Sequence, residues 1–526
     1  MIILGLGGLL RDAACAVFKD GSLQAAVEES KLTRGMYAAS RADKNMPRAA
    51  IDECLRLTGS TRDDVDCVAL ARPFSRGPES LFHIALRDQF PKSEIVVVEH
   101  HQAHAASAFY ASPFQEATVL TLDHAGDFRC GGRWHASGNQ MQLEKEWYYP
   151  DSLGRLYRAV TELLGFRAGA DEHKVQWLSG SGDDRFDGLF GEIISDAARL
   201  DASFFDGYRL SGGGFSSKFY ARLGIGDGAA IPASLAASIA HGLQRTVEDT
   251  VLKLAGEGEN LCLAGGLFYN ALLVEFLERC GRWKNVFVQG AAGNAGTALG
   301  AVYHVWHQVR HHMRHADAGS LLLGPAYGQD EIKQVLENCK LRFHYLRSTD
   351  ELLATAVRLL SEHKIVAWMQ GRMEFGPRAL GNRSILASPL DPYSTENLNV
   401  FIKHREPFRK FAASVPAELA SEYFEVGPNA RYLATVGRVR PQHRKTFESA
   451  ILGHDMVRVH TVLEGDNPLY HSLLHAAGRT TGLPVLYNTS FNLFSDPMVS
   501  TPRDAVRSFY SSGIDALFAG TFLLEK

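Results

Sequence analysis

Three arginines crowd into one glycine-rich stretch in the second half of the chain, at residues 371–384. All three, Arg372, Arg378 and Arg383, follow an apolar run that predicts a buried strand. The end of such a strand can present backbone N–H groups and guanidinium groups to an anion. Since three arginines are hard to bury without negative charge, the stretch predicts a binding site for an anionic ligand. The alternative is a surface turn whose arginines are solvated.

A second group has residue types that bind metal ions. His100 and His104 stand one turn apart on one face if the alanine-rich segment that holds them is a helix. Asp123 ends an apolar run just before Gly126 and Asp127, and a carboxylate at such a strand end is well placed to hold metal or phosphate. Two histidines and an aspartate suit Fe(II), Mn(II) or Zn(II) better than Mg(II). Two histidines on the surface of a helix are the alternative.

The elements that must position these residues follow from periodicity and turn signals. Strand, glycine turn, strand, hairpin turn and strand succeed one another over residues 1–28, the order in which an actin-like ATPase half begins. Gly265-Gly266 follows a short strand and opens a helix, so its N–H groups could hold phosphate or adenine. We expect strands at 1–5, 13–18, 23–28, 95–98, 118–122 and 261–263, and helices at 235–254, 352–360 and 502–510.

Length and composition limit the class of protein. A chain of 526 residues is longer than a single hydrophobic core usually holds, so we expect at least two domains. The composition is that of an α/β enzyme. Lys+Arg 55 against Asp+Glu 59 leaves no basic excess, which argues against nucleic acid as the partner. Seven cysteines without CxxC spacing are typical of reduced thiols in a cytoplasmic protein. No apolar stretch is long enough to predict a membrane span.

The glycine-rich stretch GRMEFGPRALGNRSIL, residues 371–386, resembles the signature of the O-carbamoyltransferases of the nodulation and antibiotic-tailoring family. The resemblance continues, in the same order, through the blocks at 403–409, 458–462 and 483–492. It implies an α/β fold with an N-terminal actin-like (ASKHA) domain of the threonylcarbamoyl-transferase kind, residues 1–318. A YrdC-like α/β domain, residues 319–526, would follow.

The resemblance also implies an activity. ATP and carbamoyl phosphate would give carbamoyl adenylate, whose carbamoyl group then passes to the hydroxyl of a small-molecule alcohol such as a secondary metabolite or sugar. A divalent metal ion, Fe, Mn or Zn, would assist the transfer, and the chain could form a homodimer.

Carried over position by position, the resemblance assigns roles to particular residues. Asp12 or a neighbouring carboxylate would be the base that deprotonates the alcohol, with Arg378 and Lys403 as further catalytic residues. The metal ligands would be His100, His104 and Asp123. The carbamoyl phosphate and ATP site would comprise Arg378, Lys403, Arg409, Arg458, Asn488 and Ser490. The adenylate site would comprise Asp123, Gly126, Asp127, Ser152, Leu153, Gly265, Gly266, Asn270 and Asn294.

Several positions depart from the family pattern. Asn294 stands where an aspartate normally completes the metal site, which predicts weaker metal binding. Arg11, Met36 and Gln176 also differ from the expected residues, so a non-catalytic nucleotide-binding partner subunit is one alternative function. Threonylcarbamoyl transfer to tRNA is another, although the lack of basic excess and the motifs of the second half disfavour it.

Overall fold

The computed structural model describes residues 1–35, 46–72, 79–195, 198–208, 214–314, 319–493 and 496–526. Met36, one of the departures above, lies outside them. The first sheet has the order β3-β2-β1-β4-β5. Its first three strands form an antiparallel meander, and β4 and β5 run parallel to β1. The bounds are β1 Ile2–Gly7, β2 Ala14–Lys19, β3 Ser22–Glu28, β4 Cys67–Ala71 and β5 Glu94–Val98.

The second sheet repeats the first. Its order, β8-β7-β6-β9-β10, again joins an antiparallel meander to two strands that run parallel to the first strand of the repeat. The helix after each last strand, α4 (His100–Phe109) or α11 (Thr297–His304), packs against the other. This duplication is that of an actin-like fold, which confirms the expected fold class. The bounds are β6 Glu116–Gly126, β7 Arg129–Ser137, β8 Gln140–Tyr148, β9 Asn260–Ala264 and β10 Asn285–Val288.

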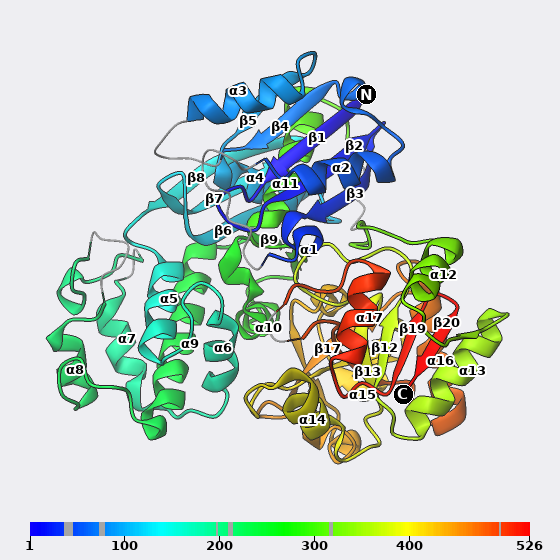
Figure 1. The fold of residues 1–526 in the computed structure, drawn as a ribbon. Coiled ribbons are helices and arrows are strands. Elements are labelled where there is room, and N and C mark those ends of the chain that lie inside the picture. Colours follow the sequence, from blue (N-terminus) through cyan, green and yellow to red (C-terminus); the bar gives the residue numbers. More distant parts are fainter. Residues whose placement is uncertain (36–45, 73–78, 196–197, 209–213, 315–318, 494–495) are drawn as a thin grey trace.

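A helical lobe interrupts the second repeat between β8 and β9, at the lower left of Figure 1. Its longest helix, α9, buries the predicted stripe that includes Leu243, Val247 and Val251, and Gly256 ends it in a positive-φ conformation. The helices of the lobe are α5 Leu153–Leu163, α6 Glu172–Ser179, α7 Asp187–Ile193, α8 Ser217–Leu223 and α9 Ala233–Ala255, and α10 Ala271–Arg279 follows β9.

The rest of the chain forms an α/β unit around one mixed sheet of ten strands, at the lower right of Figure 1. Helices α12 (Gln329–Asn338), α13 (Thr349–Ser361), α16 (Pro468–Thr481) and α17 (Pro502–Tyr510) cover it. The strand bounds are β11 His344–Tyr345, β12 Val366–Met369, β13 Arg383–Ala387, β14 Ala412–Pro416, β15 Phe424–Glu425, β16 Val436–Val439, β17 Met456–Val462, β18 Leu486–Ser490, β19 Ala516–Ala519 and β20 Phe522–Glu525.

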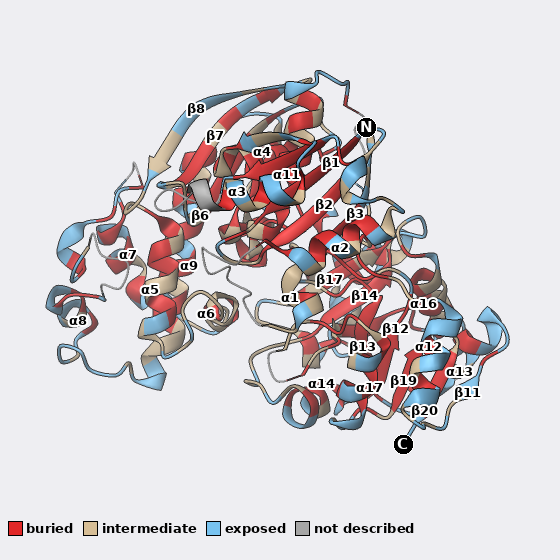
Figure 2. Ribbon diagram, turned by 45° about the horizontal axis from the view of Figure 1, so that its top comes forward, coloured by how far each residue is buried: buried red, intermediate tan, exposed pale blue. Residues whose placement is uncertain are grey.

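The expected strands and helices are present within a few residues of their predicted bounds, and the strands of the sheets are largely buried while the outer helix faces are exposed (Figure 2). The remaining α-helices of the described residues are α1 Glu29–Thr33, α2 Arg48–Leu57, α3 Glu79–Gln89, α14 Ser394–Asn397 and α15 Ala420–Tyr423, and short 3-10 and π turns lie between the elements. Of the helices in the described ranges, none combines the length and apolar character that crossing a membrane would require.

Helix α1 docks the N-terminal part onto the glycine-rich stretch. The ammonium of Lys31 donates to the carbonyls of Glu374 (2.9 Å) and Gly376 (2.6 Å) and pairs with Glu28 at 2.5 Å. Both charged side chains are at least nine-tenths buried. Burial raises the pKa of Glu28 even though Lys31 opposes the shift. The signature stretch is therefore held by the other half of the chain.

We expect Lys31→Met to lower the free energy of unfolding by about 3–5 kcal/mol, because it strands the Glu28 carboxylate in a buried site. Chemical denaturation followed by fluorescence measures the change. The matched control is Arg358→Met, which breaks the exposed pair with Glu362 and should cost less than about 1 kcal/mol. Equal losses in the two variants would show that the Lys31 contact does not hold the two halves together.

Candidate functional site

The three predicted metal ligands meet in one place. Nε2 of His100 lies 3.5 Å and Nε2 of His104 3.4 Å from Oδ2 of Asp123. Glu99 caps the helix that carries both histidines, since its carboxylate accepts from the N–H of Gln102 at 2.8 Å. The three ligand atoms lie within 4.8 Å of one another. The surface-histidine alternative is therefore wrong, because His104 is fully buried.

The chemistry of this triad suits a cation. Nε2 of each histidine and Oδ2 of Asp123 are buried and make no hydrogen bond in the described structure. Their separations are close to the roughly 3.4 Å between two ligands of one tetrahedral ion at about 2.1 Å. Burial opposes ionisation of Asp123, but the two imidazoles hold its pKa well below the usual range. The group is a carboxylate aimed at the place an ion would fill, so the residues fit a divalent metal.

Asp12, the predicted base, lies in the turn between β1 and β2, close enough to the triad for the charge of Asp123 to act on its carboxyl. Burial raises the pKa of its carboxyl; Arg11 opposes the shift, and the negative charge of Asp123 adds to it. Asp12 also adopts a left-handed conformation, with φ 63°. A carboxylate with a raised pKa is a stronger base than one in water.

Glycines bring the backbone close to the triad at two points. A Cβ on Gly126 would lie 2.0 Å from Cδ2 of His100, so the absence of a side chain makes room for the imidazole. Gly265 has φ 102°, and a Cβ there would lie 2.1 Å from the carbonyl oxygen of Leu122, one residue before Asp123. A Cβ on Gly266 would lie 3.0 Å from Oδ1 of Asp123, so the predicted phosphate turn adjoins the metal ligands.

Other predicted adenylate residues are engaged by the protein itself. The hydroxyl of Ser152 donates to the carbonyls of Asp123 and His124 and caps α5, whose first residue is the buried Leu153. Asn270 caps α10 and exchanges hydrogen bonds with Gln244, so both ends of its amide are occupied.

Asp127 and Asn294 complete that predicted set. Asp127 pairs with Arg72 at 3.4 Å. Asn294 begins a 3-10 turn, Asn294–Gly296, that packs against α4, the helix carrying the two histidines. Its Oδ1 is buried and makes no hydrogen bond in the described structure. The amide oxygen of Asn294 is therefore available to accept a hydrogen bond or to ligate a cation.

The predicted donor-binding residues gather on the third sheet. Ala412 of β14 pairs with Arg458 of β17 on one side and with Asn488 of β18 on the other. Directly paired residues of neighbouring strands share a face, so the guanidinium and the amide project from the same side of the sheet. Oδ1 of Asn488 and Nε of Arg458 are buried and have no hydrogen-bond partner in the described structure.

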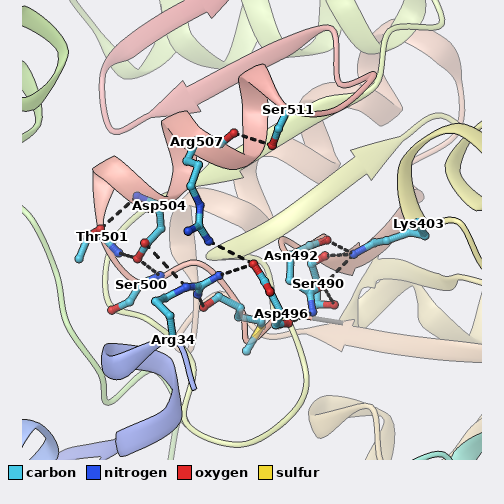
Figure 3. A network of polar contacts seen from close by, with 11 residues as sticks. Arg34, Lys403, Ser490, Asn492, Asp496, Ser500, Thr501, Asp504, Arg507 and Ser511 are labelled. Atoms are coloured by element: carbon cyan, nitrogen blue, oxygen red, sulfur yellow. Dashed lines mark hydrogen bonds and ion pairs between the residues drawn. The ribbon is translucent and has the colours of Figure 1, made fainter. Parts of the chain in front are cut away.

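Lys403 is held at this site by the segment after β18. Its ammonium donates to the carbonyl of Ser490 and to both oxygens of Asn492, the latter at 2.8 Å each. Figure 3 shows how this network continues. Asp496 lies beside Asn492, and its Oδ2 forms an ion pair with Nη2 of Arg34, a residue of the N-terminal part, at 3.5 Å. Arg34 also donates to the carbonyl of Met498 at 2.6 Å. The network links the donor site to α1.

Positive charge at the donor site is in excess. Arg378, Arg405, Arg409, Arg458 and Lys403 all have lowered pKa values. Burial is the main cause for each, and for all but Arg409 repulsion from neighbouring guanidinium groups adds to it. Such a self-repelling cluster is stabilised by an anion with several oxygens.

Two arginines of the signature stretch do not belong to this cluster. Arg383 is fully buried and donates to the main-chain carbonyls of Gln370, Gly371, Asn382 and Pro325. Arg372 donates to carbonyls of Gln24, Leu323 and Gly324. Main-chain carbonyl oxygens, and for Arg383 also the charge of Glu374, stabilise these two guanidinium groups, so neither of them indicates a bound anion. Of the three, only Arg378 joins the cluster.

The N-terminal part forms one wall of the donor site. Nη2 of Arg378 donates to the carbonyl of Tyr269 at 3.3 Å, and Lys174 of α6 pairs with Glu406 at 2.7 Å. The guanidinium of Arg458 lies over the ring of Trp177, 5.3 Å from its centre. The donor cluster therefore lies at the junction of the two halves.

Three residues of this wall and cluster were missed in the sequence. Trp177 gave no signal in the sequence, because its contact with Arg458 joins distant segments. Arg405 was detectable as a second cation in the block 403–409 but received no role. Nε2 of His173 is buried without a hydrogen-bond partner in the described structure. Burial, with the charges of Arg409 and Arg378, lowers the pKa of His173 to about 3, so its imidazole is neutral.

Comparison with known proteins agrees with this architecture. Family models described as the carbamoyltransferase N-terminus and C-terminus match residues 80–303 and 357–526. An uncharacterized protein of Synechocystis sp. is 33% identical over 100% of this chain and 96% of its own length, and nodulation protein NolNO of Sinorhizobium fredii is 31% identical over 98% and 79%. The 3'-hydroxymethylcephem-O-carbamoyltransferase of Amycolatopsis lactamdurans is 28% identical over 54% of this chain and 52% of its own. The chain belongs to the carbamoyltransferase family.

Proposed function

We propose that this carbamoyltransferase makes carbamoyl adenylate from carbamoyl phosphate and ATP and transfers its carbamoyl group to the hydroxyl of a small molecule. The observation that carries the proposal is the pairing of two unlike sites. One is a cluster of five cationic side chains, in which Nε of Arg458 and Oδ1 of the neighbouring Asn488 are buried without hydrogen-bond partners among the described residues. The other is a buried His-His-Asp triad near Asp12, the proposed base. We also propose that the units divide near residue 318 and that residues 319–526 form the adenylate-making domain.

The donor site suits the first step. Carbamoyl phosphate loses phosphate to water, and an oxygen of the resulting carbamate attacks the α-phosphate of ATP, which releases pyrophosphate. Both steps spread negative charge over phosphate oxygens, which fixed guanidinium and ammonium groups stabilise. Arg378, Arg458 and Arg409 would bind the phosphates, and the positive charge of Lys403, whose ammonium donates to Ser490 and Asn492, would attract them. The amide of Asn488, whose oxygen has no hydrogen-bond partner among the described residues, would orient the carbamoyl NH2 group, and Ser490 would contact the nucleotide.

The triad suits the second step. His100, His104 and Asp123 would hold a divalent metal ion, which supplies positive charge to polarise the carbamoyl group when bound. Asp12 takes the proton of the acceptor hydroxyl as its oxygen attacks the carbamoyl carbon and AMP leaves. The turn at Gly265 and Gly266 offers backbone N–H groups to the adenylate phosphate.

Pyrophosphate release from ATP tests the proposal. It should require carbamoyl phosphate and proceed without an acceptor. A screen of hydroxyl compounds by mass spectrometry would then identify the acceptor from products that carry one added carbamoyl group. If neither ATP nor carbamoyl phosphate binds the purified chain, the proposed donor chemistry is wrong.

Asn294 should weaken metal binding at the triad. An amide oxygen brings one negative charge fewer than the aspartate expected there, so only Asp123 balances a divalent ion. We expect Asn294→Asp to retain metal against a chelator at a concentration about tenfold higher than the wild type withstands, measured by elemental analysis after dialysis. Equal, stoichiometric metal in the two proteins would contradict this prediction.

A further inference from the structure

A second group of metal-binding side chains lies on the third sheet's covering helix, outside all the motifs discussed above. His471 and His475 stand one turn apart on α16, in the sequence HSLLH. Their Nε2 atoms lie 2.9 Å and 2.7 Å from Oε1 of Glu418. The second carboxylate oxygen lies 3.2 Å from His471. Ligand atoms from two separate segments therefore converge on one point.

The residue types are those of a zinc site. Two histidines at i and i+4 on one helix face, with a carboxylate from another segment, provide three protein ligands and leave a fourth position for water. Imidazole and carboxylate together favour Zn(II) and neighbouring transition ions over Mg(II) or Ca(II). No lysine or arginine forms an ion pair with Glu418 in the described structure, and the contacts of its carboxylate there are with the two histidines.

The geometry needs only a small adjustment. Two ligands of one tetrahedral ion at about 2.1 Å are roughly 3.4 Å apart, slightly more than the present contacts. The side chain of Glu418 is 52% exposed and can withdraw, whereas His471 is 11% exposed and already fixed by packing. The ligands are thus one preorganised histidine, one half-buried histidine and one movable carboxylate.

We propose that Glu418, His471 and His475 bind a single divalent transition-metal ion of the zinc class. The ion would act as a structural clamp. Glu418 lies in the 3-10 turn Ala417–Leu419 directly after β14, and α16 packs against that strand. Because β14 separates the strands that carry Arg458 and Asn488, the clamp would fix the sheet beneath the donor cluster. It takes no part in the chemistry.

The test must separate this site from the His-His-Asp triad. Zinc is titrated into the metal-free protein by calorimetry, and Co(II) absorption reports the ligand field. The starting protein is His100→Ala/His104→Ala, which removes two ligands of the triad. We expect it to bind one equivalent of zinc with a rise in melting temperature. Adding His475→Ala should abolish both, whereas adding His344→Ala, an exposed histidine outside any cluster, should change neither.

Further variants keep the result interpretable if one protein folds poorly. Glu418→Gln keeps a hydrogen-bond acceptor for the histidines but should weaken zinc binding at least tenfold. His475→Ala alone should lose one equivalent of zinc while still releasing pyrophosphate at the wild-type rate. If His100→Ala/His104→Ala binds no zinc, or if His475→Ala does not lower its zinc content, the cluster is a hydrogen-bonded one only and the proposal is wrong. Neither outcome bears on the carbamoyl chemistry.

Discussion

Arg378→Ala is expected to abolish formation of carbamoyl adenylate, lowering carbamoyl-phosphate-dependent pyrophosphate release by at least about a hundredfold. Arg378 is the only arginine of the signature stretch whose guanidinium lies in the donor cluster. Its positive charge interacts there with those of Arg409 and Arg458. Removing it deletes a fixed positive charge that cannot be replaced by water. Transfer from chemically supplied carbamoyl adenylate should continue, because the triad lies elsewhere.

Two variants control for general damage. Arg347→Ala removes an exposed guanidinium of the same unit and should leave both half-reactions within about twofold of wild type. Arg378→Lys keeps the charge but loses the planar fork and should fall between wild type and alanine. If the Arg378→Ala enzyme releases pyrophosphate at the normal rate, Arg378 does not take part in binding the donor substrates.

Asp123→Asn is expected to have the opposite effect to Arg378→Ala, because it should impair carbamoyl transfer and leave adenylate formation intact. The carboxylate is the one negative ligand of the triad, and its pKa is held low by His100 and His104 although burial opposes ionisation. The amide should lower metal affinity by about a hundredfold or more, since even outer-shell changes cost tenfold to a hundredfold. Transfer to the acceptor should fail, while pyrophosphate release continues.

Elemental analysis and the two half-reactions check this result. Asp123→Asn should hold one equivalent of metal fewer than wild type. Asp127→Asn is the matched control for metal content, because that carboxylate pairs with Arg72 instead of the histidines. Full metal content and normal transfer in Asp123→Asn would show that the triad is a structural ion-pair cluster.

The sequence predicted the parts of the site that depend on local spacing. The HxxxH pair needed only a helix, and the alanine-rich segment after Glu99 forms one. To place Asp123 beside the histidines, the prediction required only that its strand lie next to that helix. The strand-and-turn order of the first 28 residues was enough to predict an actin-like half, and the duplication in the second sheet follows the same order.

What the sequence could not predict are contacts between distant segments. Arg383 is buried against the carbonyl of Pro325, and Arg372 against that of Gln24, so two apparent anion-binding residues are structural. Trp177 reaches Arg458 only because α6 faces the third sheet. Such pairings depend on how the halves dock, which no local pattern encodes.

The departures from the family pattern also have structural explanations. Gln176 is buried, and its amide oxygen accepts from the first N–H of α10 at 2.9 Å. Arg11 lies close to Gly169, just before α6. Gln176 thus has a structural role in the helical lobe, and neither residue by itself indicates a non-catalytic partner subunit. Membership of the carbamoyltransferase family points the same way.

Direct detection of the intermediate tests the central claim most sharply. The purified chain is mixed with ATP and carbamoyl phosphate without an acceptor, quenched rapidly, and its nucleotides are separated by mass. We predict carbamoyl adenylate and pyrophosphate in equal amounts in wild type and none in Arg378→Ala. Carbamoyl transfer to an alcohol without consumption of ATP, or with ADP as the nucleotide product, would contradict the account.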